Sequence, residues 1–100
     1  MYRRLRLCSN NGGFEALADP PNRIDLPRVK AALEREGVSV VDARVMLIAS
    51  LEVEVTISRG GRLLFKTRDP RVAESAFERL RSLVGLPAME PEPASARGPG

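Results

Sequence analysis

Few residues in this chain have the types or spacing that catalysis needs. Histidine is absent and Cys8 is the single cysteine, which excludes Ser/His and Cys/His pairs, zinc sites of the Cys/His kind and internal disulfides. Glu52 and Glu54 alternate along a predicted strand, so two carboxylates are expected near one another on one solvated face. Acid–base catalysis also needs a pocket that shifts the pKa values of such a carboxylate pair. We predict a protein that is not an enzyme, binds no cofactor or metal, and keeps Cys8 as a buried strand-end thiol.

A second feature with chemical potential is Asn10-Asn11-Gly12-Gly13, because glycines let backbone N–H groups approach an anion. Its spacing fits neither the dinucleotide fingerprint nor the P-loop, and no Gly-Lys-Ser/Thr follows. We predict that residues 9–22 form a plain loop.

The basic residues form two clusters. The chain has net charge +3, and 14 of its 16 basic residues are arginines, a usage typical of a GC-rich genome or of a hot habitat. The candidate partner-binding cluster lies around one predicted hairpin and comprises Arg59, Arg62, Lys66 and Arg68. The second cluster lies in the N-terminal strand and comprises Arg3, Arg4 and Arg6. Both suit anionic partners, but charged hairpin tips also favour solubility and charged edge strands deter aggregation.

The elements that position these residues centre on a hairpin. Residues 51–58 alternate apolar and polar side chains, which predicts a strand with one buried face, and residues 62–67 form its partner after a Gly-Gly turn. A three-residue loop pairs Val55 with Phe65 and sets Glu54 opposite Lys66, whereas a two-residue loop would place the lysine on the core face. The three-residue loop needs a positive φ at its last position, where Gly61 stands. In that register Leu64 lies on the outer face.

Two helices are predicted, each begun by an aspartate. Asp69 caps a helix that Pro70 opens and Gly85 ends. Its apolar stripe comprises Val72, Ala73, Ala76, Phe77, Leu80 and Val84. Asp25 caps a second helix over residues 26–36, which Gly37 ends. Further strands are predicted over residues 2–8, 38–41 and 45–49.

The predicted fold is therefore α+β, an antiparallel sheet of about five strands in the order β-α-β-β-β-β-α with both helices on one face. Residues 1–86 form one domain, and the Pro/Ala/Glu/Gly-rich residues 87–100 form a disordered tail. Neither a membrane-spanning apolar run nor a signal-peptide core is visible, so we expect a cytoplasmic protein without a membrane partner.

Parts of this pattern resemble the small C-terminal region of E1-like adenylyltransferases, which activate sulfur-carrier proteins. The resemblance covers roughly residues 24–85 and rests on Ile24-Asp25-Leu26, residues 38–41, Met46-Leu47, Gly60-Gly61-Arg62, Asp69-Pro70, Ala73 and Phe77. The Rossmann domain of those enzymes and its glycine fingerprint have no counterpart in this sequence. The resemblance therefore implies a docking role, such as an accessory subunit of a sulfur-carrier activating enzyme, and no adenylylation.

The hairpin and its following helix also resemble one half of the TATA-box-binding protein fold, through the turn Ser58-Arg59-Gly60-Gly61-Arg62. This resemblance implies helices that back a curved antiparallel sheet, and a saddle only if two copies join. On the open face of that sheet Glu52 and Glu54 disfavour contact with phosphates.

Two functional hypotheses remain. The first is a non-catalytic protein-interaction module that binds a second copy of itself or another protein. It would do so through its sheet face, where Leu64 is available for contact, or through an edge strand. The alternative is a nucleic-acid-binding protein that uses the arginine-rich hairpin.

Overall fold

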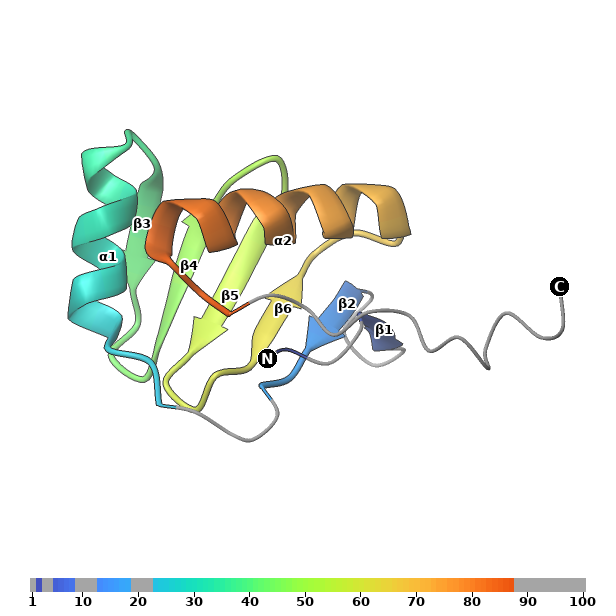
Figure 1. Cartoon of the computed structure of the whole chain (residues 1–100), viewed down its shortest axis with the longest axis horizontal. Coiled ribbons are helices and arrows are strands. Elements are labelled where there is room, and N and C mark those ends of the chain that lie inside the picture. The colour runs from blue at the N-terminus through green and yellow to red at the C-terminus, as the bar shows by residue number, and fades with distance from the viewer. Residues whose placement is uncertain (1, 3–4, 9–12, 19–22, 88–100) are drawn as a thin grey trace, which may run out of the picture.

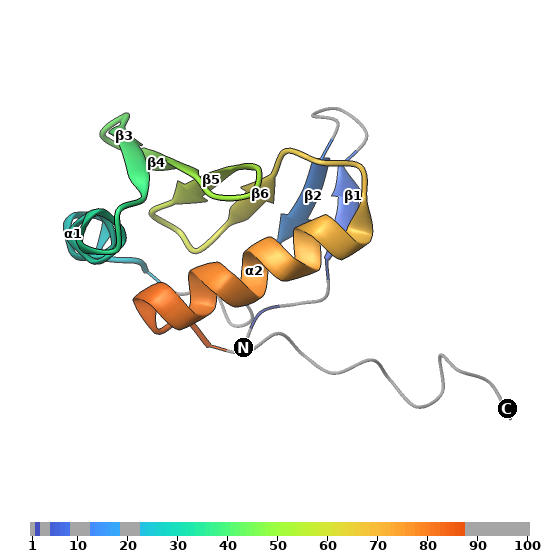
Figure 2. The same ribbon diagram turned by 90° about the horizontal axis from the view of Figure 1, so that it is seen from above.

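Six strands form one antiparallel sheet within the part of the chain that the structure, a computed structural model, describes: residues 2, 5–8, 13–18 and 23–87. The elements in chain order are β1 (Arg6–Cys8), β2 (Gly13–Ala16), α1 (Leu26–Arg35), β3 (Ser39–Asp42), β4 (Met46–Ser50), β5 (Glu54–Ser58), β6 (Leu63–Phe65) and α2 (Pro70–Val84). The strand order across the sheet is β1-β2-β6-β5-β4-β3, and both helices lie on the same face (Figures 1 and 2). The predicted α+β class, antiparallel sheet and two-helix layer are confirmed.

The β5–β6 hairpin has the predicted register. Val55 pairs with Phe65, and the Lys66 ammonium lies 3.1 Å from a Glu54 carboxylate oxygen. The loop has three residues, and its last residue, Gly61, has φ +96°. Burial selects this register because a slip of one residue would place Lys66 among the core side chains.

The preceding strand is shorter than predicted. β5 begins at Glu54, and residues 51–53 form the turn from β4, in which the Leu51 N–H donates to the Val53 carbonyl over 3.1 Å. The alternation of apolar and polar residues continues through this turn, so periodicity alone extended the strand too far. As a consequence Glu52 does not lie on the sheet face beside Glu54.

The predicted loop over residues 9–22 is wrong at residues 13–16, which form β2. This strand pairs with β1 on one side and with β6 on the other, where Phe14 lies opposite Phe65 and Ala16 opposite Leu63. It therefore adds a sixth strand to the expected sheet. Gly13 begins it, and a Cβ at this position would overlap the Phe65 carbonyl oxygen, so this glycine allows a close approach of two backbones.

The helices begin and end at the predicted residues to within one position. The Asp25 carboxylate accepts a hydrogen bond from the Arg28 N–H over 3.2 Å, and the Asp69 carboxylate accepts one from the Arg71 N–H over 2.9 Å. These caps satisfy N–H groups that have no partner within the helix. Gly85 ends α2 with φ +74°, in the left-handed region that favours glycine.

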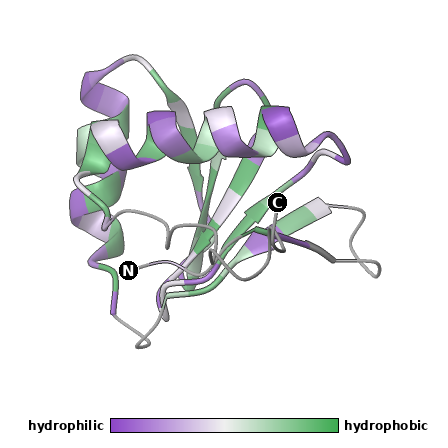
Figure 3. Ribbon diagram, turned by 45° about the vertical axis from the view of Figure 1, so that its right-hand side comes forward, coloured by the Kyte–Doolittle hydropathy of each residue, from purple (hydrophilic) through white to green (hydrophobic). Residues whose placement is uncertain are grey.

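The core lies between the sheet and the helices. α2 buries Ala73, Ala76, Phe77 and Leu80 against the inner face of the sheet. The Phe77 ring meets those of Tyr2 and Phe65 edge-on, at centroid distances of 5.5 and 6.3 Å. Figure 3 shows predominantly apolar strands, with polar positions on both helices and on the turns. The opposite face of the sheet has no described helix over it (Figure 2).

Candidate interaction surfaces

The open face of the sheet carries one continuous row of side chains, one from each strand. Directly paired positions place the members of this row, the cross-strand row, in the order Arg6, Glu15, Leu64, Thr56, Ile48 and Val41. Side chains on directly opposite residues point to the same face of a sheet, and each row member alternates with a core-facing neighbour. The row changes from charged at β1 and β2 to apolar at β4 and β3.

Most of the charge on the open face is neutralised by two ion pairs between neighbouring strands, which leave Arg6 of β1 as a further positive charge. The Arg62 guanidinium lies 2.6 Å from a Glu15 carboxylate oxygen, and Lys66 pairs with Glu54. Glu15 is the most shielded member, with 16% of its side chain exposed. These pairs hold together three strands, and they leave the face with little net charge.

The apolar part lies over β4 and β3. Val41 in the edge strand β3 is 59% exposed, although valine is among the residue types most often buried. Met46 and Ile48 in β4 are half-buried on the same face, and Leu64 in β6 is half-buried between Glu15 and Thr56. Leu64 is thus on the predicted outer face, but it is less exposed than Val41, and Thr56 of β5 separates it from Ile48 and Val41.

The four basic residues predicted to act together at the hairpin do not share a surface. Arg62 and Lys66 lie on the open face, each paired with a glutamate. Arg59 lies at the hairpin tip, where its guanidinium donates to the Arg44 carbonyl over 3.3 Å, and exposed Arg68 precedes α2. In the N-terminal cluster Arg6 is exposed on the edge strand opposite Glu15. Arg3 and Arg4 lie outside the described residues.

The glutamate pair is also separated. The Glu52 carboxylate faces α2, where it accepts a hydrogen bond from the Ser75 hydroxyl over 2.7 Å and lies 3.8 Å from the Arg79 guanidinium. Glu54 faces Lys66 on the open side of the sheet. The predicted juxtaposition of two carboxylates is therefore wrong, because the turn at residues 51–53 redirects the first of them. Asn10, Asn11 and Gly12 lie outside the described residues, as does the Cys8 side chain.

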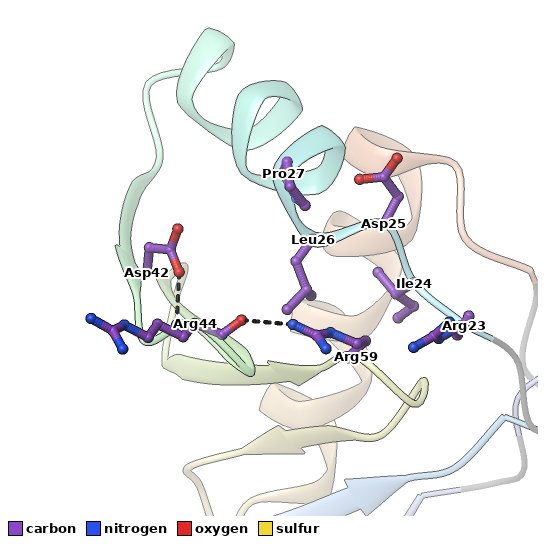
Figure 4. A pocket seen from close by; sticks show the side chains of 8 residues that line it. All are labelled: Arg23, Ile24, Asp25, Leu26, Pro27, Asp42, Arg44 and Arg59. Atoms are coloured by element: carbon purple, nitrogen blue, oxygen red, sulfur yellow. Dashed lines mark hydrogen bonds between the residues drawn. The ribbon is translucent and has the colours of Figure 1, made fainter.

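Sequence reasoning missed a grouping of arginines at the end of the sheet where the hairpin tips meet α1. Arg23, Arg44 and Arg59 line a hollow of about 390 Å³ (Figure 4). The Ile24 N–H donates to the Arg59 carbonyl over 2.8 Å, and the Arg59 N–H donates to the Val45 carbonyl over 3.3 Å, so three distant segments are joined here.

Arg44 is held in an uncommon conformation at this hollow. Its φ is +72°, and its N–H donates to the Asp42 carboxylate over 2.8 Å. A non-glycine residue in the left-handed region is uncommon. The sequence signal for this turn was Asp42, because an aspartate side chain is common in turns and can accept a hydrogen bond from the backbone N–H two residues later.

Comparison with known proteins adds no further constraint: no protein family, curated protein or solved structure matches the chain. The two resemblances noted from the sequence stay predictions. Among the described residues no group of three or more His, Cys, Asp or Glu side chains is arranged to hold a metal ion. No helix in the same part of the chain has the length and apolar character to cross a membrane.

Proposed function

We propose that this chain is a non-catalytic interaction module that self-associates, with two copies meeting through the open faces of their sheets. The observation that carries the proposal is the apolar strip on that face, formed by Val41, Ile48 and Met46. The half-buried Leu64 lies on the same face, beyond Thr56. Because Val41 in this strip is 59% exposed, covering the strip with another apolar surface removes apolar area from water and lowers the free energy.

A second copy suits this face because four of its five described charged side chains form ion pairs, and Arg6 is the fifth. Arg62–Glu15 and Lys66–Glu54 leave little net charge to repel an identical surface. A two-fold axis close to β4 would set the patch of Val41 and Ile48 on one copy against the same patch on the other. An isologous interface uses one surface patch on both copies in this way. Paired lysine and arginine offer less to a nucleic-acid backbone, which is why we prefer self-association to the arginine-hairpin hypothesis.

The size of the face sets the expected strength. Six strands spaced about 4.8 Å apart, with about four residues each at 3.3 Å, give a projected area of roughly 300 Å². Stable interfaces bury about 800 Å² of accessible surface on each partner. We therefore expect a weak dimer, with a dissociation constant of roughly 10 µM to 1 mM.

Two valines of one hairpin provide the test. Val41 lies in the cross-strand row and is 59% exposed, whereas Val45 lies in the β3–β4 turn, off that row, and is 58% exposed. Sedimentation velocity between 10 µM and 1 mM protein, ranges chosen from the expected affinity, should show a dimer that Val41→Lys abolishes and Val45→Lys leaves intact. A strict monomer for the unmodified chain, or equal loss in both variants, would overturn the proposal.

A further inference from the structure

The groove between α1 and the C-terminal end of α2 combines apolar walls with arginines on its rim. Its volume is about 540 Å³, within the range of about 300–1,000 Å³ that is usual for ligand sites. The apolar lining comes from both helices and the segment that leaves α2, and comprises Val29, Ala32, Leu83, Val84 and Leu86. In Figure 1 α2 ends beside α1, and the segment that leaves α2 turns back toward the other end of α2.

The rim of the groove is positively charged. Arg23, Arg28 and Arg35 line it, all three exposed, against the single carboxylate of Asp25. That carboxylate already accepts the Arg28 N–H as the helix cap. Three guanidinium groups against one acid leave the groove with a charge of about +2, so anionic groups are favoured beside its apolar floor.

The shape of the floor depends on the end of α2. The N–H groups of Gly85 and Leu86 both donate to the Arg81 carbonyl, over 2.8 and 3.3 Å. This termination turns the chain back on the helix and places Leu86 against the core. Part of the floor is therefore fixed by backbone hydrogen bonds rather than by side-chain packing alone.

The basic rim continues beyond the groove. Arg23, Ile24 and Asp25 also line the hollow at the hairpin tips, to which Arg44 and Arg59 contribute. The two adjoining hollows are thus lined by five arginines in all, against the carboxylates of Asp25 and Asp42. The α1 helix of 10 residues has a length of about 15 Å, which about five extended residues of a ligand would span.

We propose that this groove binds a short acidic peptide segment of a partner protein, with carboxylates on the arginine rim and apolar side chains on the floor between the helices. A peptide fits better than a nucleic acid because no described aromatic residue lines either hollow, and base stacking is the usual anchor for single strands. The apolar floor would likewise be left uncovered by a phosphate chain. This site is separate from the open face of the sheet, so it adds to the proposed self-association and does not depend on it.

The test uses a fluorescein-labelled octapeptide of alternating glutamate and leucine, measured by fluorescence anisotropy with the full chain. Two adjacent alanines of α1 give matched variants: Ala32 lines the groove and is half-buried, and Ala31 is exposed and does not line it. Glutamate suits a helix at both positions, and both substitutions change the net charge equally. We expect Ala32→Glu to weaken binding at least tenfold and Ala31→Glu to change it less than threefold.

Altered probes in the same assay identify which chemical groups the groove recognises. Replacing the glutamates of the probe by glutamine, or its leucines by serine, should each weaken binding at least tenfold if carboxylates and apolar anchors are both used. The proposal is overturned if Ala31→Glu and Ala32→Glu weaken binding equally, if the glutamine probe binds as well, or if a single-stranded oligonucleotide binds more tightly and is equally sensitive to Ala32→Glu.

The chain's own acidic residues form the last control. Glu90 and Glu92 follow shortly after Pro87, which lines the groove. If Glu90→Gln combined with Glu92→Gln tightens binding of the probe more than threefold, these residues compete for the groove, and the assignment to a partner protein is wrong. Unchanged affinity supports a partner. The Val41→Lys variant should bind the probe normally, which separates the failure of this proposal from that of self-association.

Discussion

Gly13→Ala should be among the most damaging single-methyl additions to this protein. Gly13 is buried at the start of β2, opposite Cys8 of β1. A Cβ at this position would overlap the Phe65 carbonyl oxygen and lie 3.2 Å from the carbonyl carbon of Phe65 and 3.4 Å from the Lys66 Cα. All three are backbone atoms of β6 and its extension, so no rotamer change relieves the overlap. β2 must move away from β6.

The magnitude follows from two opposing terms. Overpacking at a site that cannot yield costs about 1–3 kcal/mol, and the displacement also weakens the β2–β6 pairing of Phe14 with Phe65 and of Ala16 with Leu63. Against this, replacing glycine restricts the unfolded chain and recovers at most about 1 kcal/mol. We expect a net loss of about 1–3 kcal/mol in the free energy of unfolding, which for a domain of this size lowers Tm by roughly 5–20 °C.

Urea denaturation followed by circular dichroism measures this loss, and Gly60→Ala is the matched control. No atom lies within 4 Å of a Cβ built at Gly60, so we expect a change within about 0.5 kcal/mol of zero. If Gly13→Ala proves as stable as Gly60→Ala, then β2 does not pack on β6 as described and the role assigned to this glycine is wrong.

Three further predictions concern the core and the caps. Burial raises the pKa of Tyr2 to about 12. The native protein therefore keeps the Tyr2 hydroxyl proton at pH values where the unfolded chain, with a tyrosine pKa of about 10, releases it. The free energy of unfolding is thus unaffected below about pH 10 and falls by up to about 1.4 kcal/mol per pH unit between about pH 10 and pH 12. Urea titrations at pH 8, 10 and 11 should show this fall, and Tyr2→Phe should remove it. Phe77→Ala should lower the free energy of unfolding by about 3–5 kcal/mol, because the Phe77 ring packs edge-on against the rings of Tyr2 and Phe65. A Tm within about 5 °C of that of the unmodified protein, which corresponds to a loss of roughly 1 kcal/mol, would contradict this prediction. Asp69→Ala should cost about 1 kcal/mol through loss of the hydrogen bond from the Arg71 N–H, whereas Asp69→Ser should restore most of it in the same assay.

The part of the fold that the sequence predicts best is the part decided by local terms. The alternation around Val55 and the glycine at residue 61 both favour one hairpin register, and that register is present. The helix ends follow from the same kind of information, because an aspartate before a proline satisfies the first turn and Gly85 ends the last. Local preference and tertiary packing agree at these positions.

β2 escaped prediction because one of its two pairings, the pairing with β6, is not local. Residues 13–16 are short and preceded by asparagines and glycine, all typical of a loop. Their strand conformation is supported by the nearby β1 on one side, and on the other side by β6, whose residues lie about fifty positions later in the chain. The turn at residues 51–53 was missed for the opposite reason: the apolar alternation persists through it, since Leu51 and Val53 both pack partly against the core. Periodicity reports burial, and burial does not require a continuous strand.

The same distinction explains why the predicted arginine cluster separates. Arg59, Arg62 and Lys66 are close in sequence, but the hairpin tip and the open face are different surfaces of the fold. Arg62 is drawn to Glu15 on β2, a strand that the sequence did not reveal, and this ion pair removes it from any surface that would bind an anion. Arg59 instead joins Arg23 and Arg44, from two other connections. A cluster of like charges becomes a binding surface only when the neighbouring strands leave those charges without counterparts, and that information lies in the pairing of distant residues.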